Sequence, residues 1–217
     1  MGNRGMFIDF EGIDGSGTTT QVPLLKSHIK FLSKYNDTLE THEPWRSDEI
    51  KKRLREDEDA YSGAEEMAGL YVDDRINHSA FLINPNLEQG VFVLSDRYAL
   101  STFAYQTTQG VSQAKLFELH NDKRLVVPDI TFFLRVSSET ALARIKSRNE
   151  SREKFEQPEF LEKLANSYDY WVEQGKTNKK VLLGNIRIID GEASIEDVAE
   201  EIRESFDEFY VARKSFN

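Results

Sequence analysis

Short apolar segments rich in Ile, Val and Phe alternate with longer amphipathic stretches along the chain. The apolar segments lie at residues 6–10, 38–42, 91–95, 130–136 and 186–190. Such segments predict strands that are buried on both faces, and the lengths between them suit crossover helices. The pattern therefore predicts an α/β fold, a three-layer α/β/α sandwich around a mostly parallel five-stranded sheet.

The amphipathic stretches predict the helices. Residues 17–35 and 62–88 are long candidates, and Pro85 is expected to break the second one. A capping-box pattern at Ser194 predicts the start of a last helix whose apolar face packs on the core. The sequence contains no internal repeat, low-complexity tract or linker rich in Pro, Gly and Ser. We therefore expect a single domain over residues 1–217.

The composition excludes several functional classes. The chain has 38 Asp and Glu against 28 Lys and Arg, a formal net charge of −10. This charge argues against a protein whose main partner is nucleic acid or an anionic membrane, although a local cluster of Arg remains compatible with it. The absence of Cys excludes disulfides, Cys-ligated zinc, iron–sulfur clusters and thiol nucleophiles.

Membrane insertion and export are not expected. No apolar run approaches the roughly 20 residues that span a bilayer, and the first residues lack the apolar region of a signal peptide. The four His residues are scattered, without the spacing of a helical zinc site. The sequence therefore predicts a cytoplasmic protein without a zinc centre.

A Gly-rich segment directly follows the first predicted strand and leads into a predicted helix. It consists of Gly12, Ile13, Asp14, Gly15, Ser16, Gly17, Thr18 and Thr19. A strand, loop and helix in this order are the context of a Walker A loop, whose backbone N–H groups bind phosphate oxygens. The Thr19 hydroxyl matches the Mg²⁺ ligand of such a loop. A turn that only connects the strand to the helix is the simpler alternative.

Thr18 stands where the Walker A motif has Lys. The loop keeps its capacity to bind phosphate, but it lacks one cation close to the transferring phosphoryl group. Such a contact contributes about 1.5 to 3 kcal/mol, and loss of a comparable donor slows catalysis by roughly 10²- to 10³-fold. Catalysis at this loop therefore requires a substitute cation from another segment.

Charged residues also follow the third predicted strand. Asp96 and Arg97 lie at its end, at the edge where parallel sheets bind ligands. Asp96 is suited to hold Mg²⁺ directly or through water, and Arg97 to bind a phosphate through two hydrogen bonds. A salt bridge that only closes the strand end is the alternative.

Tyr71 and Arg75 are four residues apart, which places them on one face of the second long helix. An aromatic ring beside a guanidinium group suits a nucleotide, with the ring against the base and the cation against phosphate. In isolation, such a pair is more often a core Tyr next to a surface Arg.

Five motifs in order along residues 6–170 resemble those of the thymidylate kinases. They read FIDFEGIDGSGTTTQ, HEPWR, LYVDDR, LSDRYALSTFAYQ and PDITFFLRV. The fourth motif is the most specific, because it matches the family spacing at Asp96, Arg97, Tyr98, Ser101, Tyr105 and Gln106. The resemblance implies a P-loop nucleoside monophosphate kinase fold, with ATP and Mg²⁺ as cofactors and dTMP as substrate.

The resemblance also implies roles for individual residues. Asp14 is expected to bind the sugar 3′-hydroxyl or to approach the metal. Tyr71 takes the place of the aromatic residue that stacks on thymine. Tyr105 is expected to crowd the sugar 2′ position and so to favour deoxyribose.

The remaining implied contacts concern the base and the acceptor phosphate. Arg75 and Gln106 lie where family members hold these two groups. Arg97 is expected to bind the acceptor phosphate, Arg46 to be a further phosphate contact, and Ser101 to belong to the same substrate site.

The chain departs from the family pattern at other positions besides Thr18. Trp45 and Arg46 stand where many bacterial members have two Gly, which bears on substrate fit. Arg135 stands where Asp is common in the fourth strand, a change for which the sequence offers no interpretation.

A basic segment at about residues 144–158 corresponds to the lid over ATP, with five cations within eleven residues. In family members with Gly at the position of Gly15, the lid supplies Arg to the phosphates. We therefore expect Arg152, and next Arg148, to act as catalytic cations in place of the Lys missing at Thr18. A solvated helix face is the usual alternative for such a charge run.

The favoured function is transfer of the γ-phosphoryl group of ATP to dTMP, which gives dTDP and ADP. Two alternatives remain open. One is a catalytically weak or dead nucleotide-binding regulator on the same scaffold, and the other is a kinase for another deoxynucleoside monophosphate. The resemblance further implies a homodimer formed through helices beside the sheet.

Overall fold

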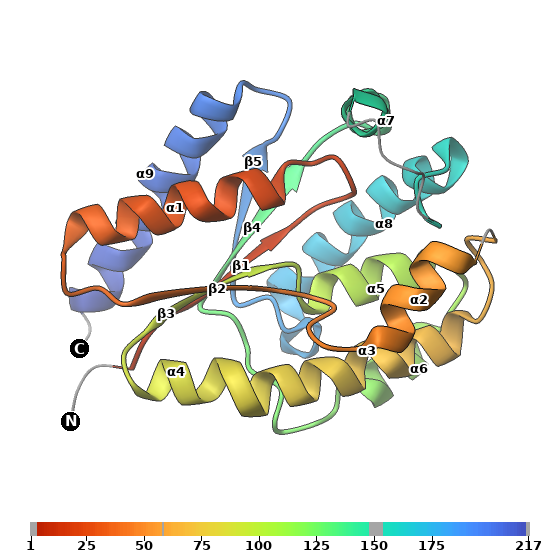
Figure 1. Ribbon diagram of the computed structural model, residues 1–217, viewed down its shortest axis with the longest axis horizontal. Helices are drawn as coiled ribbons and strands as arrows, with labels where there is room; N and C mark the ends of the chain where they lie inside the picture. The colour runs from red at the N-terminus through yellow and green to blue at the C-terminus, as the bar shows by residue number, and fades with distance from the viewer. Residues whose placement is uncertain (1–3, 58, 148–153, 216–217) are drawn as a thin grey trace.

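A fully parallel sheet forms the middle layer of the computed structural model, which describes residues 4–57, 59–147 and 154–215 (Figure 1). Within those residues, its five strands are β1 (Phe7–Glu11), β2 (Thr38–His42), β3 (Phe92–Asp96), β4 (Ile130–Arg135) and β5 (Asn185–Asp190). Their order is β2-β3-β1-β4-β5, and each neighbouring pair runs parallel. The predicted strands are confirmed to within one residue at either end, but β2 is partly exposed along its length and is not buried on both faces.

Helices cover both faces of the sheet, as the three-layer prediction requires (Figure 1). The first layer consists of α1 (Thr18–Leu32) and α9 (Ile195–Ser215). The other helices are α2 (Asp48–Glu56), α3 (Ala64–His78), α4 (Asn84–Glu88), α5 (Ala99–Thr108), α6 (Gln113–Leu119), α7 (Ser138–Ser147) and α8 (Pro158–Thr177). Among the helices of the described residues, none combines the length and apolar character that a bilayer span requires.

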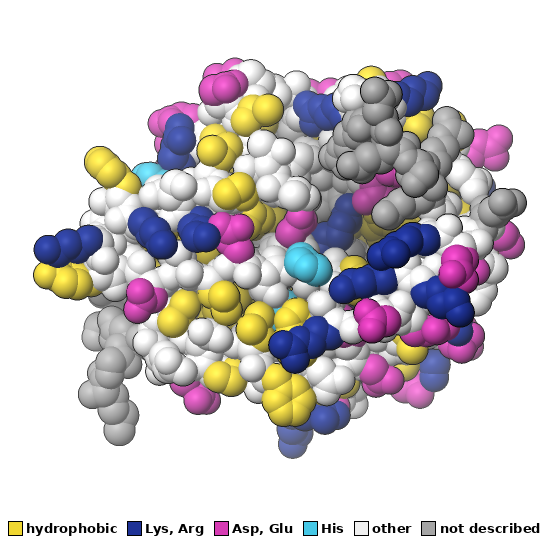
Figure 2. Space-filling model, in the orientation of Figure 1, with side chains coloured by type: hydrophobic (Ala, Val, Ile, Leu, Met, Phe, Trp, Pro, Cys, Tyr) yellow, Lys and Arg dark blue, Asp and Glu magenta, His cyan; other side chains and the backbone are white. Residues whose placement is uncertain are grey.

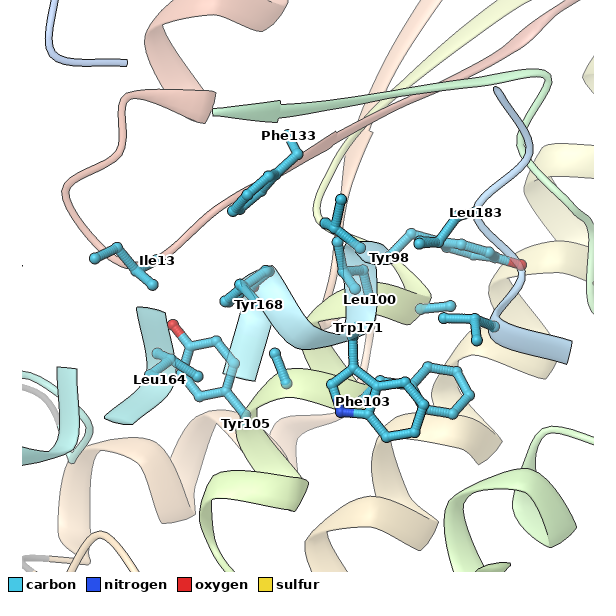
Figure 3. Packing of buried hydrophobic residues seen from close by; sticks show 14 of the residues in the cluster. Ile13, Tyr98, Leu100, Phe103, Tyr105, Phe133, Leu164, Tyr168, Trp171 and Leu183 are labelled. Atoms are coloured by element: carbon cyan, nitrogen blue, oxygen red, sulfur yellow. The ribbon is translucent and has the colours of Figure 1, made fainter. Parts of the chain in front are cut away.

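Alternate residues of β1 face the two helical layers, and all five of its residues are buried. Ile8 and Phe10 pack into the core under α1 and α9, whereas Phe7 belongs to the core under α5 and α8. In the second core, the ring of Phe133 in β4 stacks on Tyr168 of α8, with centroids 5.5 Å apart and planes at 7° (Figure 3). The sheet is therefore held from both sides by continuous apolar packing.

The expected break at Pro85 is wrong. The helix continues from α3 through a π-helical turn, η1 (Ser79–Ile83), into α4, where Pro85 lies in the first turn. The Asn84 N–H donates to the Ser79 carbonyl oxygen in the wider register of the π-helical turn. Proline is tolerated at a first turn, so the shifted register lets the chain pass Pro85 without leaving the helical path.

The strand register brings two of the predicted motifs together. Phe10 near the end of β1 pairs with Asp96 at the end of β3. The Arg97 N–H then donates to the Phe10 carbonyl oxygen at 2.8 Å. The Gly-rich segment and the Asp96-Arg97 pair are therefore neighbours at the carboxyl edge of the sheet, where parallel sheets bind ligands.

Candidate active site

The Gly-rich segment after β1 forms a tight turn that opens α1. A Cβ at Gly15 would lie 2.6 Å from the Ala141 carbonyl oxygen, so no side chain fits there. Gly17 adopts a φ of 101° as the N-cap of α1, a conformation that favours glycine. Thr18 is buried at the first position of the helix. The turn therefore presents backbone N–H groups at a helix N-terminus, the local geometry that binds phosphate.

The residues expected to hold Mg²⁺ lie against one another. The Thr19 hydroxyl donates to the Oδ2 atom of Asp96 at 2.5 Å. The Oδ1 atom of Asp96 is buried and has no hydrogen-bond partner among the described residues. Mg²⁺ prefers hard oxygen ligands such as a hydroxyl and a carboxylate. The unpartnered Oδ1 atom of Asp96 is available to bind such an ion. The donor set therefore fits a magnesium ion.

Arg97 connects the phosphate loop to the rest of the site. Its guanidinium group donates to the Gly12 carbonyl oxygen at 2.6 Å, to the Asp14 carboxylate at 2.5 Å and to the Tyr168 hydroxyl at 3.1 Å. The residue has a φ of 73°, which is unusual for a side chain other than glycine. Such a conformation costs about 1 to 3 kcal/mol and persists only where the surroundings impose it, which points to a functional position.

Glu11 at the end of β1 binds the backbone that directly follows Arg97. Its buried carboxylate accepts hydrogen bonds from the backbone N–H groups of Tyr98 at 2.9 Å and Ser101 at 3.1 Å. It also accepts from the Ser101 hydroxyl at 2.6 Å. Burial raises the pKa of Glu11, while these hydrogen bonds oppose that rise. Glu11 was not predicted from the sequence, although a carboxylate at the end of a predicted buried strand was a visible signal.

A cavity of about 360 Å³ opens beside Arg97. Seven of the residues predicted for the site line it, namely Asp14, Tyr71, Arg75, Arg97, Ser101, Tyr105 and Gln106. Its other walls come from His42, Glu43, Pro44, Lys51, Leu54, Arg55, Tyr98, Thr102 and Phe155. Lys and Arg side chains gather around a hollow on the same acidic molecule (Figure 2). A local cationic site therefore exists despite the net negative charge.

The sequence analysis also missed the cations of α2. Lys51 and Arg55 are four residues apart and both line the cavity. Their spacing on a helix was the signal that could have identified them.

Arg75 is almost completely buried in the cavity wall, with 1 % exposure. Its guanidinium group donates to Glu43 at 2.7 Å, to the Tyr98 carbonyl oxygen at 2.9 Å and to the Thr102 hydroxyl at 2.8 Å. Its Nη1 atom donates to the Nε2 atom of His120 at 3.0 Å. A planar group held from so many sides has one fixed orientation toward the cavity.

His120 accepts from Arg75 and therefore carries its own proton on Nδ1, which donates to the Leu116 carbonyl oxygen at 2.8 Å. Burial lowers the pKa of His120 to about 3, and the adjacent charge of Arg75 adds to this effect. The imidazole is therefore neutral throughout the physiological pH range.

Arg46 lies apart from the other predicted residues. Its guanidinium group sits 4.2 Å from the Trp45 ring centroid, and Trp45 in turn stacks on His78. Trp45 and Arg46 line a separate hollow beside α3, together with Phe81. The Trp45-Arg46 departure from the family pattern therefore does not alter the walls of the main cavity.

Arg144, the first cation of the basic segment, reaches the back of the phosphate loop. Its guanidinium group lies 3.4 Å from the carbonyl oxygens of Gly15 and Ser16, and it donates to the Gly191 carbonyl oxygen at 2.8 Å. Arg148 and Arg152 lie outside the described residues. Arg144 was counted in the charge run but was not predicted as a site residue.

Two further basic residues have structural roles. Lys154, at the end of the same segment, is buried and pairs with Asp57 at 2.8 Å. Arg135, which the sequence left without interpretation, pairs with Asp169 at 2.7 Å and so ties β4 to α8.

Sequence comparisons with known proteins point to one family. The family model described as thymidylate kinase matches residues 10–202. The chain is 35 % identical to the thymidylate kinase of Thermosipho africanus over 91 % of its own length and 96 % of that protein. It is 34 % identical to the thymidylate kinase of Ruegeria pomeroyi over 94 % and 95 % of the two chains. It is 39 % identical to the probable thymidylate kinase of Methanocaldococcus jannaschii over 75 % and 79 %. The chain therefore belongs to the thymidylate kinase family.

Proposed function

We propose that the protein transfers the γ-phosphoryl group of ATP to the 5′-phosphate of dTMP, which gives dTDP and ADP. The observation that carries this proposal is the position of Arg97, which donates to the Gly12 carbonyl oxygen of the phosphate loop and also lines the cavity. One guanidinium group thus adjoins both nucleotide subsites. Close positioning and charge neutralisation supply most of the rate enhancement in phosphoryl transfer.

The cavity supports a deoxynucleoside monophosphate as acceptor. Tyr71 provides an aromatic ring for the base, and the buried Arg75 provides a fixed hydrogen-bond donor. Asp14 lines the side of the cavity next to the phosphate loop, as a contact to the sugar 3′-hydroxyl requires. Tyr105 lies beside Arg97, with its ring centroid 5.5 Å from the guanidinium carbon, and so adjoins the space between base and phosphate. This supports exclusion of a 2′-hydroxyl.

The loop from Gly12 to Thr19 supports ATP as donor. Its backbone N–H groups bind the phosphates, with the partial positive charge of the α1 N-terminus behind them. Thr19 and Asp96 would hold Mg²⁺, which supplies positive charge against the phosphate oxygens when it is bound. We leave Arg46 out of this arrangement because its guanidinium group lies over Trp45, beside a separate hollow.

Arg cations replace the Lys that the loop lacks. Arg152 and then Arg148 remain the proposed catalytic cations, and Arg144 brings the start of the same segment to the loop carbonyls of Gly15 and Ser16. An Arg from another segment can stabilise transition-state charge as strongly as a loop Lys does.

The reaction needs no general base, because the attacking phosphate oxygen of dTMP is already ionised. This accounts for a site built from Arg, Asp and backbone N–H groups. Water must be kept from the transferring group, since it would otherwise accept the phosphoryl group itself.

The active molecule is proposed to be a cytoplasmic homodimer. Members of this family commonly form dimers through helices beside the sheet. Light scattering coupled to size-exclusion chromatography tests the dimer directly.

A coupled assay for ADP formation with a panel of nucleoside monophosphates tests the function. We expect turnover with dTMP to exceed that with dCMP, dGMP and dAMP by at least about 10²-fold. Binding of nucleotides without turnover would indicate the regulator instead. A higher kcat/KM with another monophosphate would identify a different acceptor.

A further inference from the structure

One wall of the cavity presents a buried hydrogen-bond acceptor without a partner. Gln106 of α5 lines the cavity and is completely buried. Its Oε1 atom has no hydrogen-bond partner among the described residues. A buried polar atom without a partner costs free energy, so its persistence in a ligand cavity points to a partner on the ligand.

The orientation of the Gln106 amide is decided by a residue behind it. The Gln106 Nε2 atom donates to the Oε1 atom of Gln109 at 3.0 Å, and the Gln109 Nε2 atom donates to the Ala60 carbonyl oxygen at 2.5 Å. A carbonyl oxygen can only accept, so Gln109 must turn its amino group toward Ala60 and its oxygen toward Gln106. Gln106 must then turn its amino group toward Gln109 and leave its oxygen in the cavity wall.

A flipped Gln106 amide is disfavoured for the same reason. Its oxygen would face the Gln109 oxygen, or Gln109 would also have to flip and face the Ala60 carbonyl oxygen with a second acceptor. Either arrangement places two acceptors in contact within a buried site, where such repulsion is strong. The Ala60 carbonyl group therefore fixes the orientation of the Gln109 amide, which in turn fixes the orientation of the Gln106 amide in the cavity wall.

On the basis of the proposed function, we infer that Gln109 is a positioning residue that makes the enzyme select thymine over cytosine. Gln109 is not among the described residues that line the cavity, and it acts only through Gln106. With Gln109 in place, the cavity offers an acceptor at Gln106 and a donor at Arg75. This pair complements a base edge that carries an N–H group beside a carbonyl oxygen.

The chemistry of the two pyrimidines explains the selectivity. Thymine has a hydrogen on N3 and a carbonyl oxygen on C4, which match an acceptor and a donor. Cytosine has a lone pair on N3 and an amino group on C4, which oppose both. A site built to hydrogen-bond one arrangement strongly rejects the other, because its buried groups lose their partners. If Gln106 were free to flip, its amino group would pair with the N3 atom of cytosine.

The substitution Gln109→Met tests this inference, because it keeps the length of the side chain and removes both hydrogen bonds. The kcat/KM for dTMP and for dCMP would be measured separately. We expect the ratio of the two to fall by at least about tenfold, through a loss with dTMP and a gain with dCMP. Most of the change is expected in KM, since the reacting phosphate is not displaced.

A double variant separates positioning from a general loosening of the fold. In a Gln106→Met background the amide that Gln109 orients is absent, so adding Gln109→Met should change the dTMP to dCMP ratio less than twofold. Gln113→Met is the matched control, since Gln113 is exposed and bonds only the Tyr170 hydroxyl among the described residues. We expect this control to keep the wild-type ratio.

The inference is overturned if Gln109→Met keeps the wild-type ratio, or if it changes the ratio equally with and without Gln106. Should Gln109→Met fail to fold, Gln109→Asn serves instead, because its shorter amide cannot reach both partners. Failure of the proposed function is distinguishable, since the wild-type enzyme would then show no preference for dTMP in the first place.

Discussion

The Arg97 guanidinium group contacts the Asp14 carboxylate at 2.5 Å, across 83 positions of sequence. The same guanidinium group donates to the Gly12 carbonyl oxygen at 2.6 Å. These two contacts fix one cation between the phosphate loop and the cavity. This pair of contacts depends on the forked shape of the guanidinium group, because the single ammonium nitrogen of a Lys cannot make both.

Replacing Arg97 by Lys should therefore cost activity even though the charge is retained. We expect kcat/KM for dTMP to fall by about 10²-fold or more, as for the loss of one transition-state donor. Steady-state kinetics provides the measurement. Arg124→Lys is the matched control, because Arg124 pairs with Asp122 at the surface. Equal losses in the two variants would contradict the role of Arg97.

The contact between Thr19 and Asp96 predicts a dependence on magnesium. Thr19→Val removes the hydroxyl ligand but keeps the shape of the side chain. We expect the Mg²⁺ concentration for half-maximal activity to rise about tenfold, consistent with the loss of one contact to a charged group. Thr20→Val changes the neighbouring exposed residue in the same way and should leave the magnesium titration unchanged. An unchanged titration for Thr19→Val would argue against this ligand.

The cations of the basic segment should contribute much of the rate enhancement of phosphoryl transfer. Arg152→Ala and Arg148→Ala are each expected to reduce kcat, with the larger loss for Arg152. Arginine fingers are worth about 10³ to 10⁵ in kcat, so losses smaller than about fivefold in both variants would reject the idea. Single-turnover measurements at saturating ATP isolate the chemical step.

The absent loop lysine permits the reverse experiment. Thr18→Lys restores the residue that the Walker A pattern has at this position, and we expect the variant to remain active or to become faster. Thr18 is buried at the start of α1, so the Lys must extend toward the phosphates to avoid leaving its charge in the core. Abolished activity in a folded variant would mean that Thr18 has a role of its own.

The neutral His120 predicts an acid-sensitive fold. Burial lowers its pKa to about 3 in the folded protein from the ordinary value of 6.5, so below pH 6.5 the unfolded chain binds the extra proton. The free energy of unfolding therefore falls as the pH decreases from 6.5 toward 3, with a slope of up to about 1.4 kcal/mol per unit. The variant His120→Gln lacks this contribution to the pH dependence of the free energy of unfolding.

Urea denaturation between pH 7 and pH 4 measures this difference. The stability of His120→Gln should fall less steeply than that of the wild type, because the carboxylates titrate alike in both proteins. His42→Gln, a substitution at an exposed imidazole, provides the matched control. Parallel curves for wild type and His120→Gln would contradict a neutral His120.

Local sequence patterns were sufficient for the sheet and for the phosphate loop. The central strands are rich in apolar residues, and the Gly-rich turn is a contiguous motif, so both depend on neighbouring residues. The expected break at Pro85 failed because the π-helical turn before it depends on packing that a helical pattern does not contain. Glu11 was missed for a related reason, since its partners Tyr98 and Ser101 lie about 90 positions away.

Residue order alone was enough to predict the layer architecture, the family and seven of the sixteen described residues that line the cavity, because motifs and hydrophobic periodicity are local features of the chain. The packed fold was needed to show which cations share that cavity, that Arg46 lies apart beside Trp45, and which way the amide of Gln106 points. The physical reason is that directional hydrogen bonds between segments distant in sequence, such as those joining Ala60 to Gln109, exist only once the sheet and its helices have packed.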